Sequence, residues 1–243
     1  MATYAIGDIH GHLDLLKAAH DRIARDQAAH GGRGEIVHLG DLLDRGPDSH
    51  GVVDYLMQGQ AAGRPWIVLM GNHDRFLPRF ARQPGWVDAG LASGRHWLDQ
   101  ATLGAAETLA SYGVEICADH ARTHAEVLRA VPEAHLRWLE NLPLWHLIPQ
   151  ALFVHAGIRP GVDLTAQAEH DLLWIRRGFL EDATDHGVLV VHGHTPVGKV
   201  THFGNRLAVD TGAAYGGPLS AVVFDETGLH LVRGKGRVPI APK

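Results

Sequence analysis

Five short polar clusters, each accompanied by glycine and each following an apolar run, constrain this sequence more than any other feature. The clearest is Gly40–Gly46, which follows the largely apolar run Glu35–Leu39 and contains two aspartates and an arginine. A short apolar run bounded by such residues is typical of a buried strand, and glycines beside it let a ligand or a neighbouring loop approach closely. Because the pattern recurs, it predicts several strands that end in chemically active loops.

The spacing of these clusters predicts a sheet with one active edge. The expected strands are Thr3–Ile6, Glu35–Leu39, Pro65–Met70, Ala151–Val154, Val188–Val191 and Leu207–Val209. Apolar residues at helical spacing separate the first three, which favours parallel neighbours whose carboxyl ends meet at one edge. Ligands of α/β sheets bind at that edge. The polar side chains expected there are Asp8, His10, Asp41, Asn72, His73, His155, His192 and His194.

The rest of the chain is predicted to complete a single domain over residues 1–243. The strand pattern fades between about residues 75 and 131, where short apolar groups predict a mainly helical, cap-like insertion beside the site. A clearer helix is expected from Pro132 to Leu142. The segments 219–224 and 229–232 predict an antiparallel hairpin, and the basic tail after Arg233 is expected to be loose.

Composition and charge exclude several classes of protein. The 243 residues are 45% hydrophobic with a net charge of −5, so they can bury a substantial core but lack the basic footprint of a nucleic-acid binder. With no apolar stretch of about 18 residues, no membrane span is expected. The single Cys117 excludes an internal disulfide and a cysteine-based zinc cluster and fits a reducing compartment. We therefore expect a cytoplasmic protein with no nucleic-acid or membrane partner, of open oligomeric state.

The residue types at the predicted edge favour a metal centre. Carboxylate, imidazole and amide ligands without thiolate suit Mn²⁺, Fe or Zn²⁺ better than an all-sulfur structural site. The set holds more ligands than one ion needs. Two divalent ions that share a carboxylate, the usual arrangement for phosphoester hydrolysis, would use them well. Asp41 is the candidate bridge because its strand is central in the expected order.

The order of the motifs resembles a known family. Gly7–Gly11, Gly40–Gly46, Gly71–Asp74, His155–Gly157 and Gly193–Thr195 occur in the order seen in the calcineurin-like metallophosphoesterases. The chain is most similar to the phosphoprotein phosphatase branch, especially its small bacterial and phage serine/threonine phosphatases, over about residues 4–225. The resemblance implies an α/β fold: a β-sandwich of mixed sheets flanked by helices, with a mainly helical insertion.

The resemblance also implies a role for each site residue. His73 would donate a proton to the leaving group with Asp44 orienting its ring, and Arg45 and Arg176 would clamp phosphate oxygens. A hydroxide bridging two divalent ions, manganese first and iron or zinc as alternatives, would attack phosphorus directly. His12 and His192 flank ligands and are not expected to bind metal. The implied metal ligands are Asp8, His10, Asp41, Asn72, His155 and His194.

Three functions are compatible with these residues. The leading prediction is a metal-dependent phosphomonoester hydrolase, a serine/threonine protein phosphatase, with a phosphorylated protein or small phosphoester as its substrate. The alternative is a symmetrical bis(5'-nucleosyl)-tetraphosphatase acting on diadenosine tetraphosphate; Asp44 argues against it because those relatives often replace this acid. A non-catalytic metal-binding module is the third reading. His73, Asp44 and Arg45 argue against it, since such a module needs neither acid nor clamp.

Overall fold

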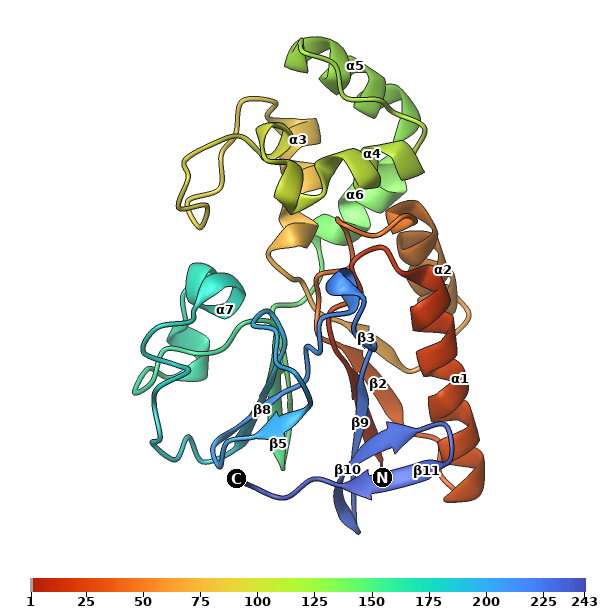
Figure 1. Cartoon of the computed structure of the whole chain (residues 1–243), viewed down its shortest axis with the longest axis vertical. Helices are drawn as coiled ribbons and strands as arrows, with labels where there is room; N and C mark the ends of the chain where they lie inside the picture. The colour runs from red at the N-terminus through yellow and green to blue at the C-terminus, as the bar shows by residue number, and fades with distance from the viewer. Residues whose placement is uncertain (1) are drawn as a thin grey trace.

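The computed structural model describes residues 2–243, which form two β-sheets packed face to face with helices outside them (Figure 1). The first sheet has the strand order β11-β10-β9-β1-β2-β3. Its strands are β1 (Thr3–Ile6), β2 (Glu35–His38), β3 (Trp66–Val68), β9 (Ala221–Asp225), β10 (Gly228–Arg233) and β11 (Gly236–Pro239). β1, β2 and β3 are parallel, with β2 between the other two, and this confirms the predicted order.

The second sheet has the strand order β4-β5-β6-β8-β7. Its strands are β4 (Trp145–Ile148), β5 (Ala151–Val154), β6 (Leu189–His192), β7 (Thr201–His202) and β8 (Arg206–Ala208). β5, β6 and β8 are parallel, whereas β4 and β7 are antiparallel edge strands. The sequence prediction omitted β4, which is half exposed and so lacks the continuous apolar run of a central strand.

A core of apolar side chains lies between the two sheets. Each sheet contributes buried residues from its central strands, because alternate side chains of a strand point to opposite faces. The aromatic rings of Phe153 and Phe224 meet edge to face across the interface, with centroids 5.6 Å apart. This packing fixes the two sheets relative to each other. It therefore also fixes the loops at their carboxyl ends.

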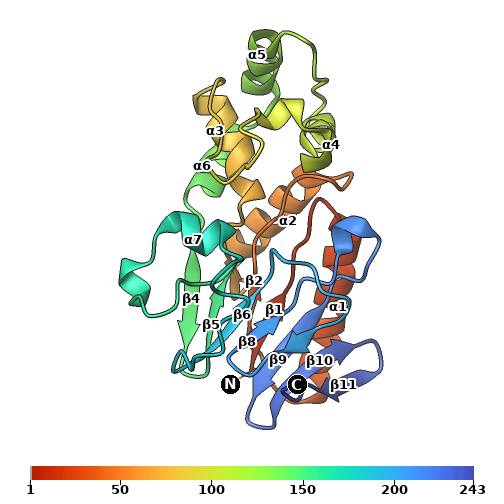
Figure 2. The ribbon, with the colours of Figure 1, turned by 60° about the vertical axis from the view of Figure 1, so that its left-hand side comes forward.

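Helices cover the outer faces of the sandwich and extend beyond one end (Figures 1 and 2). α1 and α2 lie against the first sheet, α7 lies beside the second, and α3–α6 gather at the carboxyl ends of the strands. The α-helices are α1 (Leu13–Ala29), α2 (Ser49–Ala61), α3 (Phe76–Arg82), α4 (Ala105–Ser111), α5 (His120–Ala130), α6 (Glu133–Glu140) and α7 (Glu169–Trp174). The 3₁₀ turns are η1 (His73–Arg75), η2 (Trp97–Asp99), η3 (Ala101–Leu103), η4 (Leu164–Ala166) and η5 (Ala213–Tyr215). No helix within residues 2–243 is long and apolar enough to cross a membrane.

The C-terminal tail differs from the sequence prediction. The predicted hairpin is confirmed by the antiparallel pair β9 and β10, but the expectation of a loose tail after Arg233 is wrong because β11 continues the sheet. Arg237 of β11 reaches the carboxylate of Asp26 on α1, with Nη2 2.7 Å from Oδ2. This ion pair joins residues far apart in the chain. No local sequence pattern predicts this ion pair.

Candidate active site

The predicted site residues lie together where the strands of both sheets end. Asp8 follows β1, Asp41 follows β2 and Asn72 follows β3. His155 follows β5, and His194 follows β6. All five side chains are buried, with at most 6% of their surface exposed. Parallel pairing aligns the carboxyl ends of neighbouring strands, and the facing sheets bring the two sets of loops together.

Asp41 lies at the centre of this group. Its Oδ2 is 3.3 Å from Nε2 of His10, and its Oδ1 is 3.3 Å from Nε2 of His155. The backbone N–H of His73 also donates to Oδ1 across 3.0 Å. One carboxylate oxygen therefore faces each of two ligand groups, which is the geometry a bridging ligand needs.

The residues fit two metal ions. Two clusters have ligand atoms within 4.8 Å of one another: one holds His10, Asp41 and His73, the other Asp41, His155 and His194. Oδ1 of Asp8 and Nε2 of His194 are buried without a hydrogen-bond partner. Buried polar atoms are normally satisfied, so such orphans indicate ligand positions. Carboxylate and imidazole donors without thiolate match Mn²⁺, Fe or Zn²⁺.

The tautomers of the histidines suit metal binding. Nδ1 of His10 donates to the carbonyl of Leu43 at 2.8 Å, and Nδ1 of His155 donates to the carbonyl of Leu39 at the same distance. In each ring the proton is thus on Nδ1, and Nε2 offers its lone pair to the site. Nε2 of His155 is 2.9 Å from Oδ1 of Asn72, so the two would share one ion.

Burial sets the charge states of the site. Burial, and then the carboxylates of Asp210 and Asp41, raise the pKa of Asp8. Burial first, then His155 and the charge of Arg176, lower the pKa of His194. Burial alone would raise the pKa of Asp41, but the nearby imidazoles outweigh it and hold that pKa low. Several carboxylates and imidazoles buried this close together form a site that a cation would stabilise.

Asp210 is another buried acid of this group, although it was not among the site residues predicted from the sequence. It follows β8 and is 5% exposed, and burial raises its pKa. Its Oδ1 accepts the backbone N–H of Gly212 at 2.9 Å. Its position after a predicted strand, like that of Asp8, was the available signal.

His73 and Asp44 form a buried pair beside the metal cluster. Nδ1 of His73 donates to Oδ2 of Asp44 at 2.7 Å. The same carboxylate accepts the indole N–H of Trp97 at 3.2 Å and the hydroxyl of Thr108 at 2.7 Å. Burial raises the pKa of Asp44 to about 7 even though these hydrogen bonds lower it, and burial lowers the pKa of His73. The short contact holds the ring of His73 in a fixed orientation, which a proton-transfer group needs.

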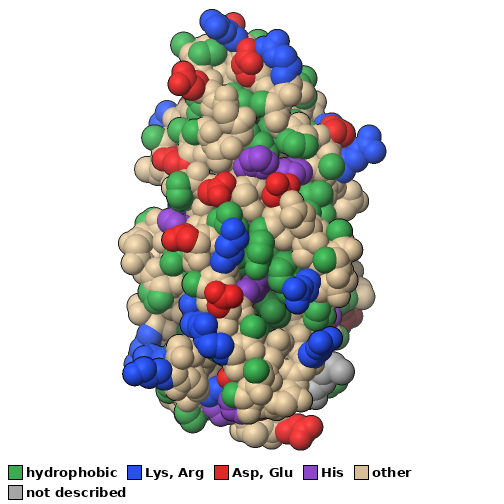
Figure 3. Space-filling model, turned by 90° about the vertical axis from the view of Figure 1, so that its right-hand side faces the viewer, with side chains coloured by type: hydrophobic (Ala, Val, Ile, Leu, Met, Phe, Trp, Pro, Cys, Tyr) green, Lys and Arg blue, Asp and Glu red, His purple; other side chains and the backbone are tan. Residues whose placement is uncertain are grey.

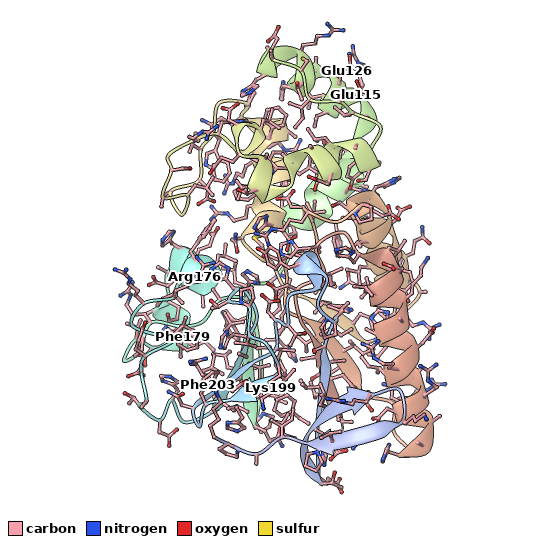
Figure 4. All side chains as sticks on the ribbon, viewed as in Figure 1. Glu115, Glu126, Arg176, Phe179, Lys199 and Phe203 are labelled. Atoms are coloured by element: carbon pink, nitrogen blue, oxygen red, sulfur yellow. The ribbon has the colours of Figure 1, made fainter. Side chains whose placement is uncertain are left out.

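The two predicted arginines occupy different positions. Nη1 of Arg45 is 2.6 Å from Nε2 of His10, and its Nη2 is 2.9 Å from Nε2 of His73. Its guanidinium also lies 5.3 Å from the ring centre of Tyr215. Arg176 lies on the exposed segment that follows α7 (Figure 4), and its side chain makes no hydrogen bond or ion pair within residues 2–243. Arg45 is inside the cluster, whereas Arg176 is at its rim.

His192 is directed away from the site. Its Nδ1 donates to the carbonyl of Gly193 at 3.0 Å, and its Nε2 accepts from Arg206 at 3.2 Å. Both ring nitrogens are thus occupied. That His192 binds no metal stays a prediction.

Unusual backbone conformations concentrate at the site. Non-glycine residues rarely adopt a positive φ, and each such residue costs on the order of 1–3 kcal/mol. Within residues 2–243 the only ones are His10, Asp41, Asp44, Arg45 and His194. Every one of them was predicted from the sequence as a site residue. The fold therefore holds these side chains in place at an energetic cost.

Comparison with known proteins agrees with this geometry. The family model described as calcineurin-like phosphoesterase matches residues 1–224. The chain belongs to this family. Bis(5'-nucleosyl)-tetraphosphatase PrpE [asymmetrical] of Bacillus anthracis is 24% identical over 260 residues, covering 98% of this chain and 96% of that protein.

Two crystal structures share the fold of this calcineurin-like phosphoesterase. One is of an inferred diadenosine tetraphosphatase, with a TM-score of 0.62, 21% identity and coverage of 95% of this chain and 92% of the other. The second is a cold-active protein-tyrosine phosphatase from Shewanella, with a TM-score of 0.60, 17% identity and coverage of 95% and 77%. The chain is accordingly a hydrolase of phosphoester bonds, from a family that uses divalent metal ions.

Proposed function

We propose that this calcineurin-like phosphoesterase hydrolyses phosphomonoesters, with phosphoserine or phosphothreonine in proteins as its substrate. The single observation that carries the proposal is the His73–Asp44 pair, joined at 2.7 Å and secured by Trp97 and Thr108. A serine or threonine alkoxide is a strong base and a poor leaving group. It departs readily only when a positioned acid gives it a proton.

Each predicted residue has a place in this proposal. Asp8, His10 and Asp41 would hold one divalent ion, while Asp41 together with Asn72, His155 and His194 would hold the other. When bound, two such ions supply a nucleophile at neutral pH and neutralise charge on the phosphate. Manganese is the first candidate, with iron and zinc as alternatives.

The chain's own side chains would then protonate the leaving group and bind the phosphate. To act as the acid, His73 would need a second ring proton on Nε2, taken up after Arg45 has left that nitrogen; it would give this proton to the leaving oxygen and keep the Nδ1 proton that donates to Asp44. Arg45 would turn from the rings of His10 and His73 to phosphate oxygens, which its planar fork can bind in pairs. Arg176 would contact the substrate from the rim.

A second candidate substrate is a dinucleoside tetraphosphate. The Bacillus relative carries the name of an asymmetrical tetraphosphatase, whereas the alternative predicted from the sequence is symmetrical cleavage. The observation that favours this candidate is Tyr215, whose side chain is 67% exposed beside Arg45. An exposed aromatic ring next to a phosphate clamp can stack on a nucleobase.

The insertion of about residues 75–131 is proposed to select between substrates. It brings Trp97 of η2 and Thr108 of α4 into hydrogen-bond contact with Asp44 of the His73–Asp44 pair. A phosphopeptide would contact this segment. A dinucleotide would instead extend along Arg45 towards Tyr215.

The test is steady-state hydrolysis by the Mn²⁺-loaded protein of a phosphothreonine peptide and of diadenosine tetraphosphate at equal concentration. A kcat/KM at least tenfold higher for the peptide supports the first proposal. The reverse result replaces it with the second, and the products then give the position of cleavage: two ADP for a symmetrical cut, ATP with AMP for an asymmetrical one. Activity on neither substrate, with two metals bound, contradicts both.

A further inference from the structure

A second group of metal-ligand side chains lies outside the active site. His50 and Asp54 are one turn apart on α2, and His135 comes from α6. Nε2 of His135 is 3.1 Å from Oδ1 of Asp54, and Nε2 of His50 is 3.9 Å from Oδ2 of the same carboxylate. One ligand atom from each of the three residues lies within 4.8 Å of the other two.

We propose that His50, Asp54 and His135 bind a zinc ion that is separate from the two ions of the active site. Zinc–nitrogen and zinc–oxygen bonds of about 2.0–2.2 Å in a tetrahedron place ligand atoms roughly 3.4 Å apart. The distances from Nε2 of His135 and of His50 to the carboxylate oxygens of Asp54, 3.1 and 3.9 Å, lie on either side of that value. Two imidazoles and one carboxylate form a typical donor set for zinc, and water would fill the fourth position.

Tyr112 holds the buried histidine in the orientation that a metal ligand needs. Its hydroxyl, at the end of α4, is 3.0 Å from Nδ1 of His135, which is 5% exposed. Without a metal, Nε2–H of His135 donates to Oδ1 of Asp54 at 3.1 Å and Nδ1 accepts from the hydroxyl of Tyr112. A hydroxyl can also accept, so on metal binding the ring proton would move to Nδ1 and donate to Tyr112, which would leave the Nε2 lone pair for the ion. Metal-binding histidines almost always have such a partner on the second nitrogen.

The charge around the group is suited to a cation. Within residues 2–243, Asp54 has no ion-pair partner except the two histidines. The side chains of His50 and Asp54 are 42% and 46% exposed, so an ion can enter from solvent. Figure 3, which shows the side of the molecule that carries α1 and α2, has histidine side chains grouped beside acidic ones in its upper half.

A bound ion would connect the insertion to the sandwich. It would join α2, which follows the Asp44–Gly46 loop, to α6, and through Tyr112 to the end of α4. α4 also contains Thr108, which binds Asp44. The ion would therefore stabilise the helices that support the acid pair without touching the substrate.

A second histidine-rich group provides a matched control. His96, Asp99 and His120 also have ligand atoms within 4.8 Å of one another. Nδ1 of His96 accepts the backbone N–H of Leu98 at 3.2 Å, so the proton of the neutral ring is on Nε2. Nε2 of His96 is buried without a hydrogen-bond partner, but a backbone N–H can only donate, so Nδ1 stays the acceptor and Nε2 keeps the proton. Neither ring nitrogen then has a free lone pair for a metal. His120→Ala is accordingly expected to leave zinc binding unchanged.

The experiment counts the zinc bound by the full chain after equilibrium dialysis against Zn²⁺, for the wild type, His50→Ala, Asp54→Asn and His120→Ala. The wild type and His120→Ala should bind three ions, whereas His50→Ala and Asp54→Asn should bind two. Zinc should raise the unfolding temperature of metal-filled wild type further than that of His50→Ala. Tyr112→Phe should keep the third ion with about tenfold lower affinity.

Equal zinc content and equal zinc affinity in the wild type, His50→Ala and Asp54→Asn would overturn the proposal. Loss of the third ion from His120→Ala but not from His50→Ala would also overturn it and would assign the ion to the other group. Both altered positions are half exposed, and Asp54→Asn preserves shape, so the variants should fold; their circular dichroism spectra check this. Hydrolysis by the Mn²⁺-loaded variants should match the wild type, because neither residue belongs to the active site.

Discussion

The indole Nε1–H of Trp97 donates to Oδ2 of Asp44 across 3.2 Å, and the same oxygen accepts from Nδ1 of His73. Trp97 begins η2 and is 53 residues from Asp44 in the chain. Thr108, on α4, binds the other carboxylate oxygen at 2.7 Å. Both residues belong to the segment expected to be a cap. Besides the proposed selection of substrate, the insertion therefore positions the catalytic pair, because its side chains hold the carboxylate that orients His73.

Replacing Trp97 by Phe should lower kcat by about ten- to a hundredfold with little change in KM. The variant loses one hydrogen bond to a charged group, worth about 1.5–3 kcal/mol, and tenfold in rate corresponds to about 1.4 kcal/mol. Steady-state kinetics on the phosphothreonine peptide measures both constants. Trp138→Phe is the matched control, since it removes an indole hydrogen bond of 2.8 Å to Gln60 far from the acid pair. An unchanged kcat for Trp97→Phe would remove this positioning role.

His73→Asn should reduce kcat on a phosphothreonine peptide by about 10²–10⁴-fold while both metals are retained. The asparagine cannot supply the proton that the leaving alkoxide needs. A p-nitrophenolate leaving group is a weak base, so hydrolysis of p-nitrophenyl phosphate should fall much less. The measurements are kcat on both substrates and metal content by elemental analysis. A variant with fewer bound metals than the wild type would instead identify His73 as a ligand.

Gly193→Ala should weaken metal binding and lower activity in proportion. A Cβ at this position would lie 2.0 Å from Oδ1 of Asp8, so the carboxylate would have to move. Activity as a function of Mn²⁺ concentration reports the change. Gly198→Ala, in the same loop, meets nothing within 4 Å and should behave as wild type. If the two variants need the same Mn²⁺ concentration, the close packing of Gly193 on Asp8 is unimportant.

Tyr215→Ala should distinguish the two proposed substrates. Stacking of a base on an aromatic ring is worth about 1–3 kcal/mol, so kcat/KM for diadenosine tetraphosphate should fall about tenfold or more. Hydrolysis of p-nitrophenyl phosphate, which has no base, should remain unchanged. Equal losses on both substrates would mean that Tyr215 acts through Arg45, which lies 5.3 Å from its ring.

Acid should remove the stability contributed by Arg237. Burial alone would raise the pKa of Asp225, but hydrogen bonds from Thr227 and Arg237 outweigh it and lower that pKa to about 2. Burial alone would also raise the pKa of Asp26, but hydrogen bonds from Arg237 and Tyr4 outweigh it and lower that pKa. Carboxylates with depressed folded pKa values stabilise the protein above their unfolded pKa of about 3.9, and this contribution is lost as pH falls through the folded value.

The measurement is urea unfolding of the wild type and of Arg237→Gln at several pH values. The variant should be about 3 kcal/mol less stable at pH 7, because it leaves buried Asp26 without its partner. The difference should shrink between about pH 4 and pH 2 as the two carboxylates are protonated. A difference that does not depend on pH would show that Arg237 acts through packing alone.

Much of the candidate site was accessible from the sequence. Asp8, Asp41 and Asn72 each follow a strand that local apolar patterning identifies, and parallel pairing then requires their side chains to meet. The positive φ of Asp41 and the glycines near it belong to the same local pattern. Short-range rules were sufficient here because each ligand lies at the end of its own strand.

Only the tertiary structure determined what surrounds those ligands. Trp97 and Thr108 approach Asp44 because the insertion folds back over the strand ends. The spacing of residues in the sequence does not predict that contact. His135 meets Asp54 across 81 residues for the same reason. The sequence alone thus determined which side chains the strand ends present, through periodicity within each strand. The packing of distant helices decided which residues hydrogen-bond to those side chains, and this packing depends on the shape of the whole folded chain.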